Sequence, residues 1–314
     1  MARNSADLGA LTESLRACRL CPRMCGVDRT TGETGFCGAD DKLRLGAVCV
    51  HLGEEPPITG PCGIVNVFFS RCSLQCPFCQ NHQISRRTPR IERVWELEEA
   101  AATVTGLLDG GTRSLGLVSP THVLPQALAL VGAVRDRGPS PPVVHNGHGY
   151  ERVEMLRAAE PFVDVYLPDV KTLDTVWAEK VFQAPDYPGR VLEALREMIR
   201  QKGTDLVLDG RGRAVRGVLV RHLVMPGRIA DSQHVLRTIA RELSPRVHVS
   251  LMAQYHPPAG LSLPAGDLAR ALTQAEYDEV VGTLAAEGLD CGWVQALESR
   301  GAYRPDFKKA LPFD

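Results

Sequence analysis

The stretch from residue 63 to residue 82, GIVNVFFSRCSLQCPFCQNH, constrains the fold of this chain more than any other. Its apolar run from Val65 to Phe69 predicts a short buried strand. A loop with three cysteines in the spacing C-x3-C-x2-C follows at once: Cys72, Cys76 and Cys79. Three thiolates this close suit a 4Fe–4S cluster, in which each sulfur binds a different iron. Because the loop holds no fourth cysteine, one iron would keep an open coordination position, as reactive metal sites do. A zinc loop and a set of reduced structural cysteines are the alternatives.

Composition and charge narrow the class of protein. The 314 residues suffice for one large α/β domain with a small additional module. A net charge of −1, scattered Lys and Arg, and only 5% aromatic residues disfavour a nucleic-acid or membrane-surface partner. The first residues lack an apolar signal segment, and no apolar run approaches membrane-spanning length. Since the ten cysteines cluster with metal-like spacing, we expect reduced thiols in a cytoplasmic metalloprotein.

A second group of cysteines precedes this stretch, among glycine-rich turns. Its spacing is C-x2-C-x3-C-x11-C, and its members are Cys18, Cys21, Cys25 and Cys37. The pattern predicts a closed tetrathiolate site that holds zinc or a second iron–sulfur cluster, and spacing does not choose between the metals. Free thiols in a loop are the alternative. We expect residues 1–60 to form this Cys-rich metal-binding module and its linker, with a short amphipathic helix over 8–17 and a connecting loop over 51–62.

Strands and helices alternate beyond residue 60. Apolar runs predict six strands, at 63–69, 115–118, 143–144, 163–167, 218–224 and 247–251. Helical periodicity is found between them, at 97–108, 124–134, 190–201 and 232–243. Six β/α repeats predict an α/β fold, a partial (β/α)6 barrel over 61–257, followed by a C-terminal helical extension over 258–314.

Polar side chains follow every predicted strand. In parallel β/α folds the loops at the carboxyl ends of the strands meet on one face and carry the chemistry. Besides the three loop cysteines, these residues are Ser119, Thr121, His122, Asn146, Asp169, Lys171, Arg221, Tyr255 and His256. Any one of them alone could equally be a capping or surface residue.

The loop resembles the hallmark of the radical S-adenosylmethionine (SAM) enzymes, C-x3-C-x-aromatic-C, with Phe78 at the aromatic position. That resemblance implies that an open iron chelates the amino and carboxylate groups of SAM. One electron then splits SAM to a 5′-deoxyadenosyl radical. Further segments resemble one branch of that superfamily, the pyruvate formate-lyase activating enzyme homologues, across about residues 18–257: CRLCPRMCGVDR, FFSRCSLQCPFCQN, VSPTH, DVYLPDVK, VRHLVMPG and SLMAQYHP.

The resemblance implies roles for individual residues. Phe78 and His256 would lie near the adenine, Asp169 and Lys171 would contact the ribose and carboxylate region, and Arg221 would face the carboxylate. A guanidinium fork suits a planar carboxylate, and a lysine supplies a compact charge.

The chain departs from the activase pattern at two turns. Ser119-Pro120-Thr121-His122 replaces the usual Gly-Gly-Glu-Pro, so the acid that receives the SAM ammonium is missing. The oxygens of Ser119 and Thr121, or backbone carbonyls, must substitute for it. Asn146 stands where the activase has an Asp associated with a monovalent cation, so that cation site is in doubt.

Three functions remain open at this point. The first is hydrogen abstraction from a glycine of a partner glycyl radical enzyme, with a flavodoxin or ferredoxin as the reductant. The second is radical SAM chemistry on a small molecule or another protein residue. The third is an iron–sulfur electron carrier or redox sensor, which would not need Asp169, Lys171 and Arg221 beside an open iron. An incompletely closed barrel favours a protein loop as the substrate.

Overall fold

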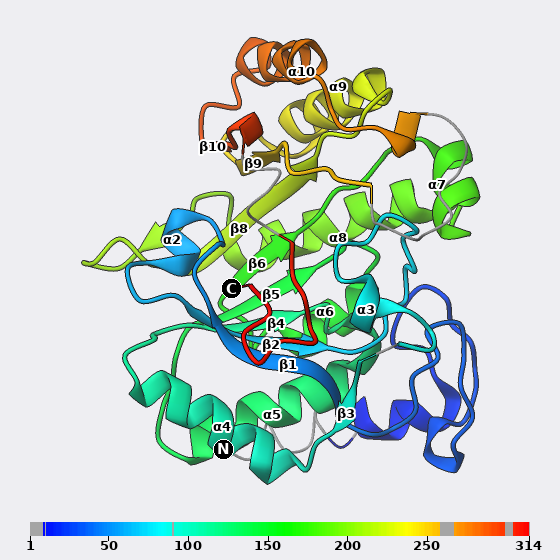
Figure 1. The fold of residues 1–314 in the computed structure, drawn as a ribbon, viewed down its shortest axis with the longest axis vertical. Helices are drawn as coiled ribbons and strands as arrows, with labels where there is room; N and C mark the ends of the chain where they lie inside the picture. Colours follow the sequence, from blue (N-terminus) through cyan, green and yellow to red (C-terminus); the bar gives the residue numbers. More distant parts are fainter. Residues whose placement is uncertain (1–8, 10, 90, 258–266, 299–303, 314) are drawn as a thin grey trace.

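A mostly parallel β-sheet runs through the computed structural model, which describes residues 9, 11–89, 91–257, 267–298 and 304–313 (Figure 1). Its parallel strands are β2 (Ile64–Phe69), β4 (Leu115–Val118), β5 (Val143–Gly147), β6 (Val165–Pro168), β8 (Ala214–Leu223), β9 (His248–Met252) and β10 (Gly292–Val294). Three antiparallel strands complete the sheet: β1 (Arg44–His51), β3 (Arg93–Val94) and β7 (Val207–Leu208). The strand order is β10-β9-β8-β6-β5-β4-β2-β1-β3, with β7 on β8.

All six strands expected from the sequence lie in this sheet, as β2, β4, β5, β6, β8 and β9. The sequence analysis missed β1, β3, β7 and β10. Three of these strands have only two or three residues, too few for a periodic pattern, whereas β1 is an apolar run between Arg44 and His51 that the analysis overlooked. In the described part of the chain the strand path ends at β3 and at β10, and these two strands do not pair with each other.

Helices cover one face of the sheet. They are α4 (Leu97–Asp109), α5 (Leu124–Asp136), α6 (Val153–Ala159), α7 (Thr175–Phe182), α8 (Tyr187–Lys202), α9 (Ile229–Thr238) and α10 (Gln274–Ala286). Helix α4 packs on β1 and β2, and α8 packs on β6 and β8. On α4 the buried residues Ala101, Val104 and Leu108 recur with the helical period and face the sheet. Helix α10 begins at a capping box of Thr273 and Glu276.

The side chains of β2 alternate between two cores. Val65, Val67 and Phe69 belong to the large core shared with the helices. Phe68 points the other way, where it packs with Phe307 and with Phe313 of the C-terminal segment. Every residue of β2 is therefore buried, which explains its unbroken apolar run.

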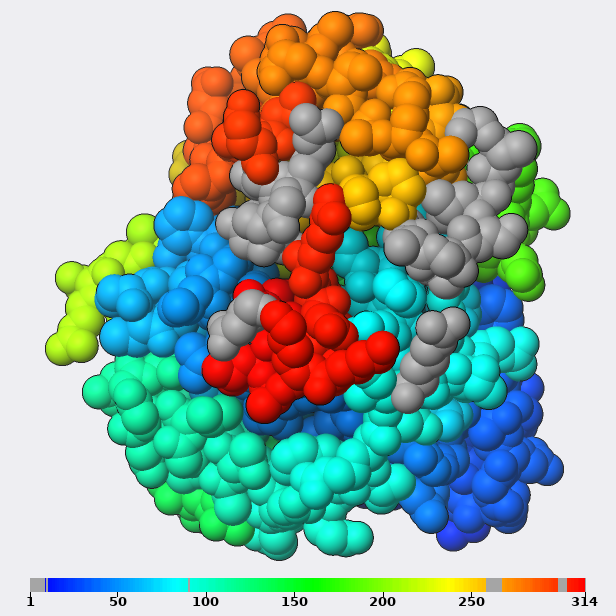
Figure 2. Space-filling model, in the orientation of Figure 1, coloured from blue at the N-terminus to red at the C-terminus, as the bar shows by residue number. Residues whose placement is uncertain are grey.

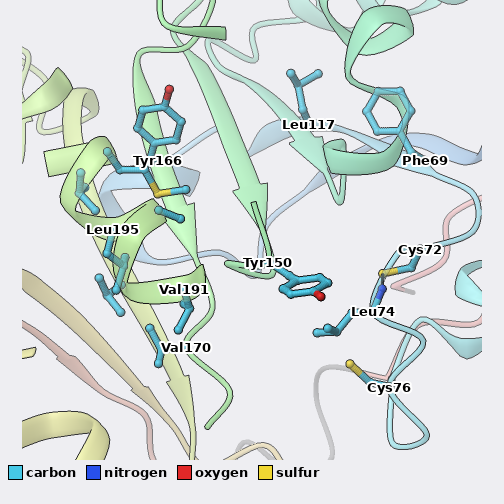
Figure 3. Close-up of a cluster of buried hydrophobic side chains, with 14 of the residues drawn as sticks. Phe69, Cys72, Leu74, Cys76, Leu117, Tyr150, Tyr166, Val170, Val191 and Leu195 are labelled. Atoms are coloured by element: carbon cyan, nitrogen blue, oxygen red, sulfur yellow. Dashed lines mark hydrogen bonds between the residues drawn. The ribbon is translucent and has the colours of Figure 1, made fainter. Parts of the chain in front are cut away.

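The large core reaches the cysteine loop. Figure 3 shows Leu74, which lies on the same loop as Cys72 and Cys76, pointing toward Tyr150. Leu74 and Tyr150 are both buried in the cluster that contains strand and helix residues. Packing of this kind anchors the loop to the body of the protein.

The secondary structure near the two ends of the chain agrees in part with the prediction. The helix expected over 8–17 is helical at residues 9 and 11–13 and continues as the 3-10 turn Ser14–Ala17, while residues 8 and 10 lie outside the described part. The loop expected over 51–62 contains one short helix, α2 (Pro56–Thr59). The expected C-terminal extension contains α10 and β10, and its residues 258–266, 299–303 and 314 lie outside the described part. No described helix is both long and apolar enough to cross a bilayer.

A buried acid lies behind the turn after β5. Glu151 is 3% exposed, and its Oε1 accepts a hydrogen bond of 2.6 Å from Thr121 Oγ1. Burial raises the pKa of Glu151 from 4.5 to about 7, although the bond from Thr121 lowers it in part. The folded protein therefore prefers the protonated acid. The stability that this preference adds is present below the ordinary pKa and is lost as the pH rises through about 7.

Glu151→Gln removes this titration and keeps an acceptor for Thr121. Between about pH 5 and about pH 8 the wild type should lose up to about 3 kcal/mol more unfolding free energy than the variant. Urea unfolding of both proteins at the two pH values measures the difference. Glu98→Gln, at an exposed acid of α4, is the control and should follow the wild-type pH dependence. Parallel curves for wild type and Glu151→Gln would contradict the prediction.

Candidate functional site

A cavity of about 410 Å³ opens at the carboxyl ends of the parallel strands. This volume lies within the range of small-molecule and cofactor pockets. The predicted site residues that line it are Cys72, Cys76, Phe78, Cys79, Ser119, Asn146, Asp169, Lys171 and Arg221. The segment 304–313 lies over this part of the molecule, and its Pro305 and Phe313 contribute to the lining (Figure 2). Residues far apart in the sequence therefore meet where parallel strands end.

The loop that carries the three cysteines is held in an unusual backbone conformation. Arg71 and Gln75 have φ values of 71° and 57°, which side-chain-bearing residues rarely adopt. The Gln75 amide braces the loop by donating to the carbonyls of Cys72 (2.7 Å) and Ser85 (2.9 Å). Arg71 is fixed by an ion pair with Glu92 at 2.9 Å. These contacts hold the loop in shape.

Two of the three thiols, those of Cys72 and Cys76, are buried. Burial raises the pKa of Cys72 to about 11 and raises that of Cys76 further, while nearby Lys171 lowers both. A metal centre binds thiolates, so loading it must displace these protons. Among the described residues, no three His, Cys, Asp or Glu side chains are placed to hold a single metal ion. In an iron–sulfur cube each thiolate binds its own iron, so its ligands do not converge on one point.

A buried lysine lies beside the cysteine loop. Lys171 Nζ forms an ion pair of 2.8 Å with Asp169 Oδ2, just beyond the end of β6. Burial lowers the pKa of Lys171, but Asp169 and Cys76 raise it by more, so the net shift is upward. Lys171 is therefore a fixed positive charge at the cavity. The backbone N–H of Lys171 donates to Tyr187 Oη at 3.0 Å, which holds this turn in place.

Arg221, at the same level on β8, is paired with two acids that sequence reasoning missed. Its Nε donates to Glu55 Oε1 at 2.8 Å, and its Nη2 donates to Glu55 Oε2 at 2.5 Å and to Glu54. Burial lowers the pKa of Arg221, but the two glutamates raise it well above its usual value. The signal was present in the stretch HLGEEPP, where two adjacent acids follow an apolar strand in a segment interpreted only as a linker.

The remaining predicted site residues differ in whether they line the cavity. Ser119 lines the cavity with φ 56°, and its backbone N–H donates to the Asn146 carbonyl at 2.8 Å. Thr121 lies outside the lining and uses its hydroxyl on Glu151. His256 also lies outside the lining, within 3.0 Å of Arg304. Phe78 lines the cavity and stacks on Trp177, with ring centroids 5.9 Å apart.

The charged lining of the cavity is net negative. Three carboxylates, those of Glu54, Glu55 and Asp169, face the two cations Lys171 and Arg221. His148 also lines the cavity; burial and nearby Lys171 lower its pKa, so it is neutral. Its Nδ1 accepts from the Tyr150 backbone, and its Nε2 lies 3.0 Å from Ser73 Oγ. A ligand that carries a net positive charge would match this lining.

The four N-terminal cysteines surround a second, very small cavity, together with Arg29 and the side of His122. Backbone N–H groups of Phe36 and Ala39 donate to the sulfurs of Cys25 and Cys37, at 3.3 Å and 3.5 Å. Burial raises the pKa of Cys21 to about 12. The four thiols thus line one cavity, but no three of them are placed to hold a single metal ion in the part of the chain that the structure describes, so the metal centre stays a prediction.

Comparison with known proteins adds a fold relationship. No protein-family model matches the chain. An uncharacterised protein of Methanocaldococcus jannaschii is 27% identical over 248 residues, which cover 76% of this chain and 66% of that relative. The crystal structure of Streptococcus suis SuiB bound to the precursor peptide SuiA superposes with a TM-score of 0.50 at 11% identity, over 76% of this chain and 50% of SuiB. SuiB bound to S-adenosylmethionine gives a TM-score of 0.48 at the same identity over 74% of this chain. The likeness to peptide-bound SuiB shows a shared fold across about half of that larger protein.

Gln75→Ala tests whether the amide braces the cysteine loop. Alanine keeps the same backbone cost at a positive φ, so the comparison isolates the side-chain hydrogen bonds. The variant should lose about 1–3 kcal/mol of unfolding free energy, the sum expected for two or three such bonds. Urea unfolding measures this loss. Gln274→Ala, which removes one exposed bond to Asp278, should change stability by less than about 0.5 kcal/mol. Equal effects of the two substitutions would contradict the bracing role.

Proposed function

We propose that this chain is a radical SAM enzyme whose 4Fe–4S cluster is held by Cys72, Cys76 and Cys79. The observation that carries the proposal is that these cysteines share one cavity with Asp169, Lys171 and Arg221, at the carboxyl edge of a mostly parallel sheet. The fold shared with SuiB supports it. An electron carrier has no need of a cofactor-sized cavity with fixed charges beside its cluster, so that alternative explains less of the geometry.

The residues of the cavity fit SAM in charge and in size. SAM carries one carboxylate, one ammonium and one sulfonium, a net positive charge, and the charged lining is net negative. The lining also offers the aromatic ring of Phe78 and the apolar side chains of Val118, Leu223 and Met252 to an adenine and its ribose. When bound, the cluster would supply the electron that splits SAM into methionine and a 5′-deoxyadenosyl radical.

The residues of the chain itself bind, orient and shield. Lys171 is held by Asp169 so that its positive charge stays at the cavity. The C-terminal segment contributes Phe313, which packs on His51 with ring centroids 4.0 Å apart and limits access of water. A radical survives long enough to react only where bulk solvent is excluded. The cavity wall thus serves to protect the reactive group as well as to bind it.

We further propose a peptide or protein loop as the substrate, with a glycyl radical enzyme as the first candidate and a flavodoxin or ferredoxin as the electron donor. SuiB, which shares the fold, binds a precursor peptide. A partial barrel that is open at one side would admit such a loop. A small-molecule substrate is the alternative. The cytoplasm is the compartment that suits ten cysteines clustered with metal-like spacing.

The central test is anaerobic reconstitution of the protein and of the triple variant Cys72→Ala/Cys76→Ala/Cys79→Ala. With SAM and dithionite the wild type should form 5′-deoxyadenosine, and the triple variant should form none and lack the electron paramagnetic resonance signal of the reduced cluster. A wild-type cluster that is reduced and reoxidised without binding SAM would support the electron carrier instead. Deuterium transfer into 5′-deoxyadenosine then separates substrates: label that comes only from a small molecule, never from candidate partner proteins, would overturn the protein substrate.

The N-terminal cysteines are proposed as a second metal centre, zinc or iron–sulfur, on account of a buried cation. Arg29 is 1% exposed and donates to the carbonyls of Asp40 and His122 and toward Cys18 Sγ at 3.8 Å. In the described part of the chain it has no carboxylate partner. A buried charge without a counter-charge is costly, and a metal–tetrathiolate centre is anionic. Such a centre would balance Arg29.

The triple variant of the loop cysteines also tests this second centre, because it leaves the N-terminal four intact. About one zinc ion, or about four irons, should remain per chain in elemental analysis. Adding Cys21→Ser and Cys37→Ser should remove that metal and lower the melting temperature. A triple variant free of both zinc and iron after reconstitution with each metal would show that the four thiols bind none.

A further inference from the structure

One arginine joins the N-terminal cysteines to the loop of Cys72, Cys76 and Cys79, hereafter the three-cysteine loop. Arg23 lies between Cys21 and Cys25 in the sequence, and its Nε donates to the carbonyl of Ser73, within that loop, at 3.1 Å. Burial raises the pKa of the Cys21 thiol, and a hydrogen bond from the Arg23 backbone N–H lowers it in part. Arg23 therefore contacts a cysteine of one group with its backbone and the loop of the other group with its side chain.

The other two nitrogens of the Arg23 guanidinium bind the end of helix α7. Nη2 donates to the carbonyl of Phe182, the last residue of that helix, and Nη1 donates to the carbonyl of Gln183, its C-cap. The ring of Phe182 packs against Phe78 of the three-cysteine loop, with centroids 6.1 Å apart. Arg23 thus holds one point of the loop directly, at Ser73, and also holds the helix end on which Phe78 packs.

Ser73 itself is a fixed point of the three-cysteine loop. It is fully buried, and its Oγ lies 3.0 Å from His148 Nε2. The backbone N–H of Tyr150 donates to His148 Nδ1, so Nε2 carries the proton of this neutral ring and donates to Ser73. The hydroxyl of Ser73 is therefore held by His148 and its carbonyl by Arg23. Because Ser73 directly follows Cys72, a displacement of its backbone would displace the Cys72 thiol.

The charge of Arg23 is not neutralised by an acid. Its side chain donates to three backbone carbonyls, and no carboxylate of the described residues forms an ion pair with it. Asp186, the acid that Tyr150 contacts, is paired with Arg190 instead. The guanidinium lies over the ring of Phe36, 3.7 Å from its centroid, and aromatic contact of this kind covers a cation without cancelling its charge. A positive charge therefore remains beside the three-cysteine loop.

We propose that Arg23 is a positioning residue for the reactive cluster: it fixes the three-cysteine loop at Ser73, and its charge favours the reduced state of the cluster. This inference rests on the proposed function. Reduction takes one electron from the donor and adds one negative charge to the cluster, so a nearby unpaired cation stabilises the product of that step. The N-terminal segment thereby takes part in the radical reaction whichever metal its four cysteines hold.

Two measurements on the anaerobically reconstituted protein test the two parts of this role. Redox titration, followed by the electron paramagnetic resonance signal of the reduced cluster, gives the midpoint potential. Arg23→Ala should lower the equilibrium constant for reduction about tenfold, which is about 59 mV for one electron, and Arg23→Lys should restore most of it because it keeps the charge. Hydrogen exchange of the peptide over 70–79, measured by mass spectrometry, should be several-fold faster in Arg23→Ala because Ser73 loses a fixed contact.

Arg152→Ala is the matched control, because Arg152 donates to the carbonyl of Arg19 in the same N-terminal segment but forms an ion pair with Glu154. It should leave both the potential and the exchange of 70–79 as in the wild type. If Arg23→Ala does not fold or load a cluster, Arg23→Gln, which keeps donors without the charge, replaces it in the titration. Wild-type potential and exchange in the Arg23 variants, or equal shifts in Arg152→Ala, would overturn the proposal. A wild type that holds no cluster would overturn the proposed function, and the exchange comparison would still test the hold of Arg23 on the loop.

Discussion

The pairing of buried charges at the carboxyl edge of the sheet is the constraint on which the rest of this structure depends. Lys171 with Asp169, and Arg221 with Glu54 and Glu55, place five charged groups around one cavity. Charges in such a place are tolerated only when their partners are held at hydrogen-bond distance. The register between β6 and β8 keeps them there, because Asp169 and Arg221 face each other as a bridge at the ends of these strands.

The remaining architecture keeps that edge rigid. Helices pack on one face of the sheet and bury the odd-numbered side chains of β2, while the C-terminal segment packs on Phe68 from the other side. The N-terminal module is tied to the same edge: Arg23 Nε donates to the carbonyl of Ser73, the residue after Cys72. Arg29 reaches the His122 carbonyl, and His122 in turn contacts the Ser70 carbonyl. The two groups of cysteines are therefore held within one network of hydrogen bonds.

The cavity also draws charged residues from an unexpected part of the chain. Only the position and the charge of a group in the cavity matter to a ligand, not the segment that supplies it. The turn after β4 has no acid, and its Ser119 takes a left-handed conformation at the cavity. Acids from the segment between β1 and β2 line the same cavity.

The sequence by itself determined the local elements and the grouping of three cysteines on one loop. The six strands were predictable because each is a short apolar run followed by polar residues, and Cys72, Cys76 and Cys79 were recognisable because their spacing is local. The tertiary structure decided which distant residues meet. It paired Arg221 with Glu54 and Glu55, which precede it by 167 and 166 positions, and it placed Thr121 and His256 outside the cavity. Sequence periodicity reports the face on which a side chain lies, whereas the partner of a buried charge depends on strand order and register, which arise only when the sheet assembles.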